Sequence, residues 1–449
     1  MKMNGMKVLI FVLMLLAVLF SVSCQQKPEE KKEPQPKTVN TYQVSYPYWE
    51  QYAVFDVWIT DTQKNLYSIS DLPNKQPVFL KDHVKSMNGA LILQENGTLW
   101  KRIQDNKLKK LYDNVQRVEN VWSSPVVLKK DQTLWNVFNS ELIDNVSQYQ
   151  QDYALKTDGS LWTSIGNKNL KILDGVKSYA ADISSLGGSS VVCAILNDDS
   201  LWMYGSNQYG SLGNGSSDHT TVAVKVMADI LSAFPFFNTV YAIKKDQSLW
   251  SWGYNNSGQV GNGASRNVVT PIKILDNVKY VGAIEGTAYA ILNDNTFWIW
   301  GAYAFGKPNE KPKLVSTDVN EIITNVLFSP YVKNGIFFMK NDHSLWQVLE
   351  VGPQKLLDNV KSFYTSLSNN CAVLEDGSLM IWKNAKSFVT NRETPFRIDQ
   401  NVSSIVDNLF VIFYTKDDGS LWQIGKLNEI TKSKGPYYTV PTEVKLPAK

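Results

Sequence analysis

Cysteine and histidine are both scarce in this chain of 449 residues, with three of each. Three cysteines exclude a disulfide framework. His83, His219 and His343 form no His-x-His or His-x-x-x-His pair, and the chain has no Cys-x-x-Cys. A metal site or a Ser-His-Asp arrangement therefore has no support in the sequence. We expect no catalytic residue, no metal and no cofactor.

An excess of charge of one sign is also missing. The net charge of +3 comes from 45 Lys+Arg against 42 Asp+Glu, and residues 1–37 alone hold six lysines and three glutamates. The rest of the chain is balanced, because 45 − 6 and 42 − 3 both leave 39. Without a basic stripe to neutralise phosphates, we expect no nucleic-acid binding. The 12% aromatic and 43% hydrophobic content excludes a disordered protein.

Long apolar runs are confined to the N-terminus. The run from Val8 to Phe20 is thirteen residues long and follows Lys2 and Lys7. It is too short to span a bilayer and fits a secretory signal peptide. Ser21-Val-Ser-Cys24 resembles a bacterial lipobox, although Ser21 stands where that pattern prefers Leu. The resemblance implies a lipoprotein signal peptide over residues 1–24 with Cys24 acylated. The alternative is an ordinary secreted protein in which Cys24 is incidental.

Residues 25–40 predict a tether. The segment QQKPEEKKEPQPKTVN has no aromatic residue and only Val39 is apolar, so it cannot bury enough surface to fold. Extended at ~3.1 Å per residue, it would hold the following domain on the order of 40–50 Å from a bilayer. We expect a protein of the bacterial cell envelope, with residues 41–449 in the periplasm or outside the cell. No later segment has 18 consecutive apolar residues.

Ten copies of one pattern fill the chain from about residue 55 to residue 425: an apolar stretch, a polar turn, and then Ser or Thr followed by Leu-Trp. One copy is Leu155-Lys-Thr-Asp-Gly-Ser-Leu-Trp162. The last position is Trp in eight of the ten copies, and we name it the tryptophan slot. The slot residues are Tyr67, Trp100, Trp135, Trp162, Trp202, Trp250, Trp298, Trp346, Met380 and Trp422.

A second marker, an Asp/Asn-rich turn that ends on a β-branched residue, precedes nine of the slots, as in Asp276-Asn277-Val278. The distance from that residue to the slot is 20 in five of nine copies, whereas the distance onward to the next marker varies from 11 to 28. Length variation is therefore expected mainly in the connection after the slot. Asp-Gly and Asn-Gly turns between apolar residues predict β-hairpins. Units of about 40 residues suit four-stranded sheets, whose radial repetition is a β-propeller.

The longest connections resemble a known repeat. Trp252-Gly253-Tyr-Asn255-Asn-Ser-Gly258-Gln259-Val-Gly261-Asn-Gly263, followed by Pro271-Ile-Lys-Ile274, is similar to the repeat of the RCC1 (regulator of chromosome condensation) family. Tyr204 to Gly215 is a second copy, and Trp300-Gly301 begins a third that soon departs from the pattern. The resemblance implies an all-β fold, an RCC1-like β-propeller of four-stranded blades.

The number of blades stays open at this point. Family propellers usually have seven blades, whereas ten hairpin repeats are present here. The chain is either an enlarged ring or a ring with about three units in a separate or degenerate part. The C-terminal Pro441-Thr-Glu-Val444 resembles the strand that opens each unit. We expect it to pair beside the first blade and so remove two exposed sheet edges.

Several repeated residue types have a functional and a structural interpretation. The slot tryptophans could stack on sugars, but their fixed place in a strand favours packing between adjacent blades. Aspartates in the hairpin turns, such as Asp246, could form a ring of carboxylates, but Asp is favoured there because it bonds its own backbone. Cys193 and Cys371 stand four units apart, too far to bridge, and suit small core positions. The glycine-rich loops at 205–215 and 253–263 lack the helix start of a phosphate loop.

The turns between the marker strand and the apolar strand differ from repeat to repeat and should lie at one end of the propeller. They carry aromatic residues with scattered carboxylates, which is typical of a protein-recognition surface. The alternative is that several of them fold back and cover the blade ends. The candidate binding residues are Trp122, Asp152, Phe236, Phe237, Glu285 and Phe328.

These patterns predict a lipid-anchored, exported propeller that binds a protein and performs no catalysis. Founding members of the family act as exchange factors for a small GTPase and contact chromatin, but the signal peptide and lipobox place this chain in another compartment. Secreted bacterial relatives that grip and inhibit an enzyme are the closer comparison, so an inhibitor or scaffold of a secreted or surface protein is expected. The alternatives are a glycan-binding surface lipoprotein and a polysaccharide-acting enzyme, which needs two converging carboxylates.

Overall fold

The computed structural model describes residues 43–45, 56–61, 63–70, 77–88, 90–103, 107–119, 126–136, 141–150, 153–163, 169–182, 191–284, 286–302, 311–324, 336–349, 351–365, 369–383, 394–407, 412–424 and 441–446. Over these residues every regular element is a β-strand, and none is a helix that could cross a membrane. Cys24 and residues 25–40 lie outside the described residues, so the lipid anchor and the tether stay predictions.

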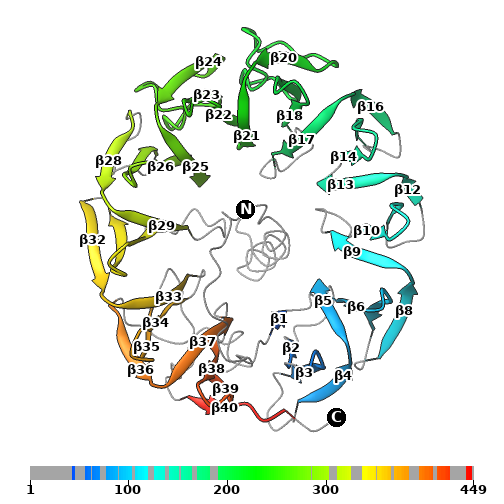
Figure 1. The fold of residues 1–449 in the computed structure, drawn as a ribbon, viewed down its shortest axis with the longest axis vertical. Coiled ribbons are helices and arrows are strands. Elements are labelled where there is room, and N and C mark those ends of the chain that lie inside the picture. Colours follow the sequence, from blue (N-terminus) through cyan, green and yellow to red (C-terminus); the bar gives the residue numbers. More distant parts are fainter. Residues whose placement is uncertain are drawn as a thin grey trace, which may run out of the picture.

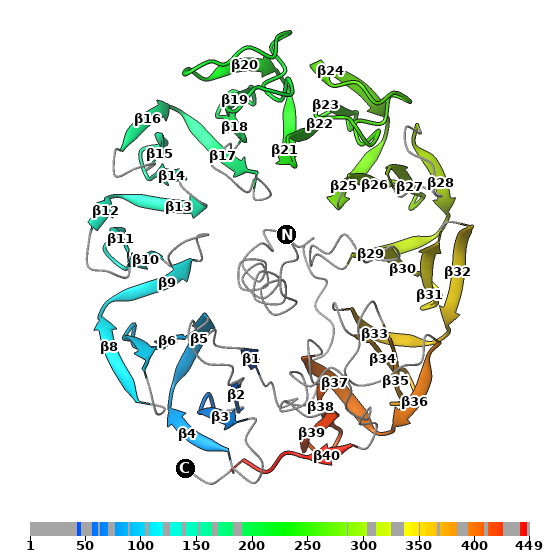
Figure 2. The same ribbon diagram turned by 180° about the vertical axis from the view of Figure 1, so that it is seen from behind.

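The strands form ten antiparallel four-stranded sheets that stand as the blades of one ring (Figure 1, and from behind in Figure 2). In every blade the spatial order of the strands is their order in the chain, with the first strand toward the ring centre and the fourth at the perimeter. The first strand of the first blade contacts the first strand of the tenth, which closes the circle. The prediction of four-stranded propeller blades is confirmed, and all ten repeats belong to the same ring.

Blades one to five cover the N-terminal half of the ring. Their strands are β1 (Gln43–Ser45), β2 (Asp56–Thr60), β3 (Leu66–Ser70) and β4 (Val78–Lys81); β5 (Val84–Asn88), β6 (Leu91–Gln94), β7 (Leu99–Arg102) and β8 (Leu108–Tyr112); β9 (Val115–Glu119), β10 (Val126–Lys129), β11 (Leu134–Asn136) and β12 (Glu141–Ile143); β13 (Val146–Gln150), β14 (Tyr153–Lys156), β15 (Leu161–Thr163) and β16 (Leu170–Leu173); and β17 (Val176–Ala181), β18 (Val191–Leu196), β19 (Leu201–Gly205) and β20 (Val224–Met227).

Blades six to ten complete the ring. Their strands are β21 (Ile230–Phe236), β22 (Thr239–Lys244), β23 (Leu249–Gly253) and β24 (Val268–Leu275); β25 (Val278–Ile284), β26 (Thr287–Leu292), β27 (Phe297–Gly301) and β28 (Lys313–Ser316); β29 (Val319–Thr324), β30 (Ile336–Lys340), β31 (Leu345–Leu349) and β32 (Gly352–Leu357); β33 (Val360–Thr365), β34 (Asn369–Leu374), β35 (Leu379–Lys383) and β36 (Phe396–Asp399); and β37 (Val402–Asp407), β38 (Ile412–Lys416), β39 (Leu421–Ile424) and β40 (Thr442–Glu443).

The C-terminal strand corrects one expectation. β40 pairs with β39 and is the fourth strand of the tenth blade, so it does not pair beside the first blade. Fourth strands are the ones that follow the tryptophan slot, and Pro441 to Val444 resembles Pro271 to Ile274 because both occupy that position. The expectation about loop length agrees with the strand bounds, since the connection after the slot varies from two residues, 350–351, to eighteen, 206–223. The connection between the first and second strands is also long in three blades, from 46 to 55, from 182 to 190 and from 325 to 335.

A backbone hydrogen bond ties each blade to the next. The amide of the residue that opens a blade donates to the carbonyl of a left-handed residue in the preceding blade's hairpin turn, at 2.8–3.0 Å. Asp-Gly turns suit this position because glycine adopts positive φ without strain. The bond occurs at nine junctions: Val84 to Lys64, Val115 to Gly97, Val146 to Gln132, Val176 to Gly159, Ile230 to Asp199, Val278 to Gln247, Val319 to Asn295, Val360 to His343 and Val402 to Gly377.

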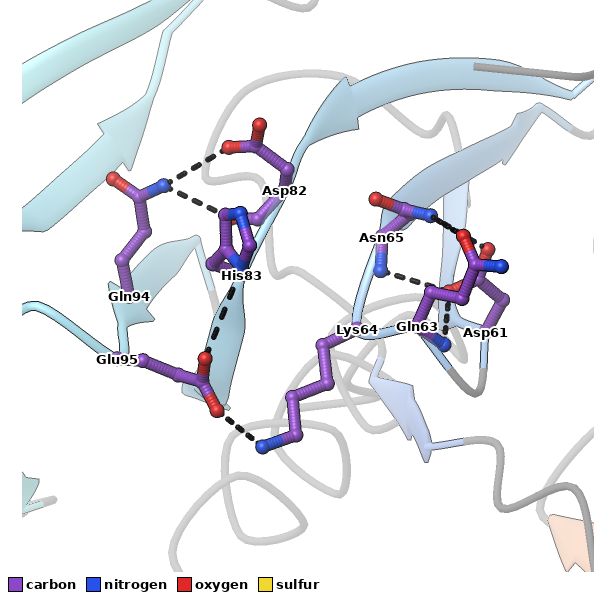
Figure 3. Close-up of polar contacts among 8 residues, drawn as sticks. All are labelled: Asp61, Gln63, Lys64, Asn65, Asp82, His83, Gln94 and Glu95. Atoms are coloured by element: carbon purple, nitrogen blue, oxygen red, sulfur yellow. Dashed lines mark hydrogen bonds and ion pairs between the residues drawn. The ribbon is translucent and has the colours of Figure 1, made fainter.

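Side chains at the same turns add ion pairs across the junctions. Lys64 of the first blade pairs with Glu95 of the second, and a Glu95 oxygen lies 3.8 Å from Nδ1 of His83 (Figure 3). His343 of the eighth blade repeats the arrangement, with its Nδ1 3.1 Å from Glu375 of the ninth. All of these side chains are largely exposed, so water screens the pairs and they add little to stability. His83 and His343 are therefore parts of the junctions between blades.

The tryptophan slot is structural. Trp250 Nε1 donates to the Ser248 hydroxyl at 2.9 Å, and that hydroxyl donates to Asp246 at 2.6 Å. These hydrogen bonds from the side chain and the backbone of Ser248 hold the pKa of Asp246 below its ordinary value. The same Asp–Ser/Thr–Trp relay occurs at Trp135, Trp162, Trp202, Trp298, Trp346 and Trp422.

The hydrophobic core is divided among the junctions. Nine apolar clusters in the described part of the chain each combine one face of a blade with the facing side of the next. The clusters between blades five and six and between nine and ten enclose Cys193 and Cys371, which are buried free cysteines, as predicted. Seven slot residues pack against such clusters, which confirms that they lie between blades: Trp100, Trp135, Trp162, Trp250, Trp346, Met380 and Trp422.

Candidate functional site

The two ends of the ring differ in construction. One end carries the hairpin turns between second and third strands and the links from one blade to the next, and we name it the hairpin end. The other carries the connections between first and second strands and between third and fourth strands, and we name it the loop end. Because neighbouring strands in every blade are antiparallel, successive connections alternate between the two ends of the ring. The predicted binding turns all belong to the loop end.

The described residues include two of the six predicted binding residues. Phe236 is the last residue of β21 and Phe237 begins the turn to β22. Trp122, Asp152, Glu285 and Phe328 lie outside the described residues, and their roles stay predictions. The site is therefore built from the sixth blade and its neighbours, where residues 191–284 form an unbroken described stretch.

Phe237 and Asn238 form a tight two-residue turn. Phe236 pairs with Thr239 across it, and φ is +47° at Phe237 and +60° at Asn238. Positive φ at both central residues defines a type I′ turn, whose twist matches that of the strands. Asn is common at such positions, but a bulky aromatic residue with positive φ is an outlier. Keeping Phe237 there costs of order 1–3 kcal/mol, which the surrounding structure has to offset.

A buried carboxylate from the neighbouring blade holds this turn. Asp182 follows β17 of the fifth blade and is completely buried. Its two oxygens accept hydrogen bonds from the backbone amides of Phe237 at 3.3 Å and Asn238 at 2.8 Å. The carbonyl of Asn238 in turn accepts the Ser211 hydroxyl at 2.6 Å and the Tyr254 amide at 3.0 Å. The turn is thus bonded to both the fifth and the sixth blade.

The glycine-rich loops clasp the following blade. Trp252 Nε1 of the sixth blade donates to the carbonyl of Ser211 in the loop of the fifth, at 2.9 Å. A Cβ on Gly213 would lie 2.7 Å from that indole nitrogen, so only glycine fits. A Cβ on Gly261 would likewise lie 2.8 Å from the indole nitrogen of Trp300 in the seventh blade. The loops serve as joints between blades five, six and seven, in agreement with the structural interpretation of their glycines.

Four aromatic side chains gather above this framework. The rings of Phe236 and Phe237 lie 4.9 Å apart, edge to face, and the rings of Tyr209 and Tyr254 lie 4.8 Å apart. All four are half-buried. The backbones that carry the two pairs meet, because the amide of Tyr254 donates to the carbonyl of Asn238, beside Phe237. Phe236 also packs against the apolar cluster between blades six and seven. We name Tyr209, Phe236, Phe237 and Tyr254 the aromatic patch.

Sequence reasoning identified the two phenylalanines but missed the rest of the patch. Tyr209 and Tyr254 lie in the glycine-rich loops, which belong to the same end of the ring as the variable turns. Knowing that third-to-fourth-strand connections share an end with first-to-second-strand turns would have found them. No sequence pattern indicated a role for Asp182, because the residues that it bonds lie 55 and 56 positions further along the chain. Among the described residues no group of three His, Cys, Asp or Glu could hold a metal ion.

Comparison with known proteins agrees with the repeat assignment. Residues 246–284 match the regulator of chromosome condensation (RCC1) repeat, from the hairpin of the sixth blade to the end of β25. The resemblance predicted from residues 252–274 is thereby confirmed, and the chain is an RCC1-like β-propeller. A comparison with curated proteins gives no significant match.

Solved structures of similar fold include three distant examples. Prp20p from Saccharomyces cerevisiae is 15% identical, with a TM-score of 0.33 over 60% of this chain and 76% of that one. Human WBSCR16 is 13% identical, with a TM-score of 0.34 over 77% and 86%. The computationally designed Ika8 protein is 11% identical, with a TM-score of 0.32 over 87% and 98%.

Proposed function

We propose that this protein is a lipid-anchored, exported propeller that binds another protein through the loop end of its ring and performs no catalysis. The observation that carries the proposal is the aromatic patch on its rigid support. Aromatic side chains are enriched among the residues that dominate binding energy at protein interfaces. Here four of them come from two blades and are held by bonds that run between those blades.

The support of the patch favours binding over a purely structural role. A surface already fixed in its bound shape loses little conformational entropy when a partner docks. Phe237 stays in a strained conformation that an Asn at the same position would adopt freely, and strain of this kind clusters at functional sites. The described turn therefore keeps an aromatic ring where stability alone would favour a polar residue.

The N-terminal sequence supports the location. A leader over residues 1–24, acylation of Cys24 and a spacer over residues 25–40 together suit a domain that reaches partners near a membrane surface. An inhibitor or a scaffold of a secreted or surface protein fits this arrangement. The proposed compartment is the cell envelope of the bacterium that produces the protein.

Site-specific photo-cross-linking in intact producing cells tests the proposal. A photoreactive amino acid replaces Phe237, and in a control protein it replaces Leu231, an apolar residue that is 63% exposed near the start of β21, at the hairpin end. We expect a discrete protein adduct from position 237 and none from position 231. Equal labelling at both positions, or no protein adduct at 237, would contradict protein binding at the loop end.

Two further outcomes distinguish the alternatives. Saturable binding of the purified lipoprotein to a glycan array, lost in Phe236→Ala and without a protein adduct in cells, would assign the patch to glycans instead. Hydrolysis of a polysaccharide by the purified protein would refute the absence of catalysis.

A further inference from the structure

The loops that carry the aromatic patch contain few charged residues. Residues 204–222, 234–238 and 252–270 form the two glycine-rich loops and the phenylalanine turn, and their only formally charged side chains are Asp218 and Arg266. In the whole chain 19% of residues are charged. The exposed positions of these loops are instead mostly small or amide residues, among them Gln208, Asn214 and Asn256.

The hairpin end has the opposite character. Its turns carry an aspartate at a fixed position in nearly every blade: Asp131, Asp158, Asp198, Asp246, Asp294, Asp342, Asp376 and Asp418. Hydrogen bonds from the Ser or Thr two residues later lower the pKa of each of these carboxyls, so they are ionised at neutral pH. Lysines stand at several of the same turns, among them Lys156, Lys245 and Lys416, so this end presents charges of both signs.

We infer that the aromatic patch binds an uncharged, apolar segment of a partner protein, with Phe237 as its anchor and Asp182 as the positioning residue of that anchor. This inference rests on the proposed function and specifies its partner. Burying a charged group against the patch would remove its water without supplying a counter-charge, which is costly. An apolar segment meets no such cost, and the surrounding amide side chains can bond its backbone.

The same details favour a protein segment over a neutral glycan. Phe236 and Phe237 lie at 77° to each other, so the edge of one ring covers the face of the other. Phenylalanine also offers no polar group to a sugar hydroxyl. Asp182, which is completely buried, already accepts the amides of Phe237 and Asn238. The two phenylalanine rings of the patch are therefore purely apolar, as a site for an apolar protein segment requires.

Asp182 acts through the turn and does not touch the partner. Its two oxygens bond the amides at both central positions of the type I′ turn. An asparagine at position 182 keeps the size but offers one acceptor oxygen instead of two. One of the two amides then loses its acceptor, and the position of the Phe237 ring is no longer fixed from the fifth blade.

Selection from a random-peptide library displayed on phage tests the inference on the purified full-length lipoprotein. We expect the selected peptides to be apolar and to lack charged residues. Their affinity should change less than about twofold between roughly 0.01 M and 1 M salt, over which the Debye length falls from about 30 Å to 3 Å. Selection of charged peptides, a strong salt dependence or no selection at all would overturn the inference.

Phe237→Asn separates binding from folding. Asn tolerates positive φ, so relief of backbone strain should offset the lost contact with Phe236, and this variant should unfold close to the temperature of the wild type. It should nevertheless bind the selected peptides roughly thirtyfold more weakly, as expected when an aromatic anchor is lost. The matched control is Leu231→Asn, which removes an apolar side chain that is 63% exposed on β21, the strand before the Phe237 turn, and should leave the affinity unchanged. Equal effects of the two variants would refute the role of Phe237.

The role of Asp182 is tested through coupling. Asp182→Asn should weaken peptide binding about tenfold in the wild type and have almost no further effect in Phe237→Asn, because the anchor it positions is gone. A residue that only stabilises the fold would lower the melting temperature in both backgrounds without this coupling. Binding of a neutral oligosaccharide that depends on Phe237 would assign the patch to glycans. If position 237 gives a protein adduct in cells but the purified protein selects charged peptides, this inference is refuted. The proposed function, protein binding at the loop end, would still stand.

Discussion

Substituting Gly253 by alanine should destabilise the propeller much more than the same change at a left-handed glycine without a close neighbour. Gly253 ends β23 with φ at +97°, and a Cβ there would lie 2.2 Å from the carbonyl oxygen of Asn238. Favourable contacts between carbon and oxygen begin at about 3.3 Å, so the carbonyl has to move by about 1 Å. That oxygen accepts both the Ser211 hydroxyl and the Tyr254 amide. The substitution therefore disturbs the joint between blades five and six.

The expected loss combines two contributions. Positive φ costs an alanine about 1–2 kcal/mol. Two weakened hydrogen bonds add about 1 kcal/mol each, which brings the total to about 3–4 kcal/mol. Gly159→Ala is the matched control, because Gly159 has φ at +82° but its Cβ would lie no closer than 3.6 Å to any neighbour. It should lose only the backbone contribution of about 1–2 kcal/mol.

Urea unfolding followed by tryptophan fluorescence measures both variants. We expect the midpoint of Gly253→Ala to fall at least twice as far as that of Gly159→Ala, with similar slopes. Equal shifts of the midpoint would refute the reasoning, because they would mean that the Asn238 carbonyl moves away from the added Cβ without a cost in stability. Photo-cross-linking from position 237 should also decrease in Gly253→Ala and remain intact in Gly159→Ala.

Two other predictions follow from the structure and a third from the N-terminal sequence. Ser248→Ala removes the acceptor of the Trp250 indole and should lower the free energy of unfolding in urea by about 1 kcal/mol. Ser248 also lowers the folded pKa of Asp246, so the stabilisation is present above the unfolded pKa of about 3.9 and is lost as pH falls through the folded value. Urea titrations from about pH 5 downward should therefore show a shallower acid decline in Ser248→Ala than in the wild type. Cys24→Ser should abolish incorporation of labelled fatty acid and release the protein from the membrane fraction; retention there would contradict the lipid anchor.

Local features of the fold were predictable because each depends on a few adjacent residues. The tryptophan slot is the second residue of the third strand in all ten blades, as its fixed place after the hairpin turn implied. The Asp-Gly turns are where the predicted hairpins lie, and their glycines have the positive φ that such turns need. The resemblance of residues 252–263 to an RCC1 repeat was likewise carried by glycines and an asparagine that one loop requires.

Features that depend on contacts between blades were not predictable. Each blade touches only its neighbours, so no single repeat encodes how many blades complete a circle. The fourth-strand position of β40 follows from a pairing with β39 that a long connection separates in sequence. The bond from Asp182 to the Phe237 turn joins different repeats, and neither residue belongs to the shared pattern. The predicted binding residues Trp122, Asp152, Glu285 and Phe328 stay predictions.

The uniformity of the hairpin end explains why recognition belongs to the other end. At nine junctions the same backbone bond requires a left-handed residue in the hairpin and an amide at the start of the next blade, so the sequence there is constrained by ring assembly. The loop end tolerates connections of very different length, and its bond from a tryptophan indole to the preceding loop is found at two junctions among the described residues, five–six and six–seven. Between blades five and six, Asp182 adds two bonds to the Phe237 turn. The bonds from Asp182 are not part of the pattern that the blades share, and they fix a turn that holds Phe237 in a strained conformation. The proposed role of Phe237 in binding a partner explains both features.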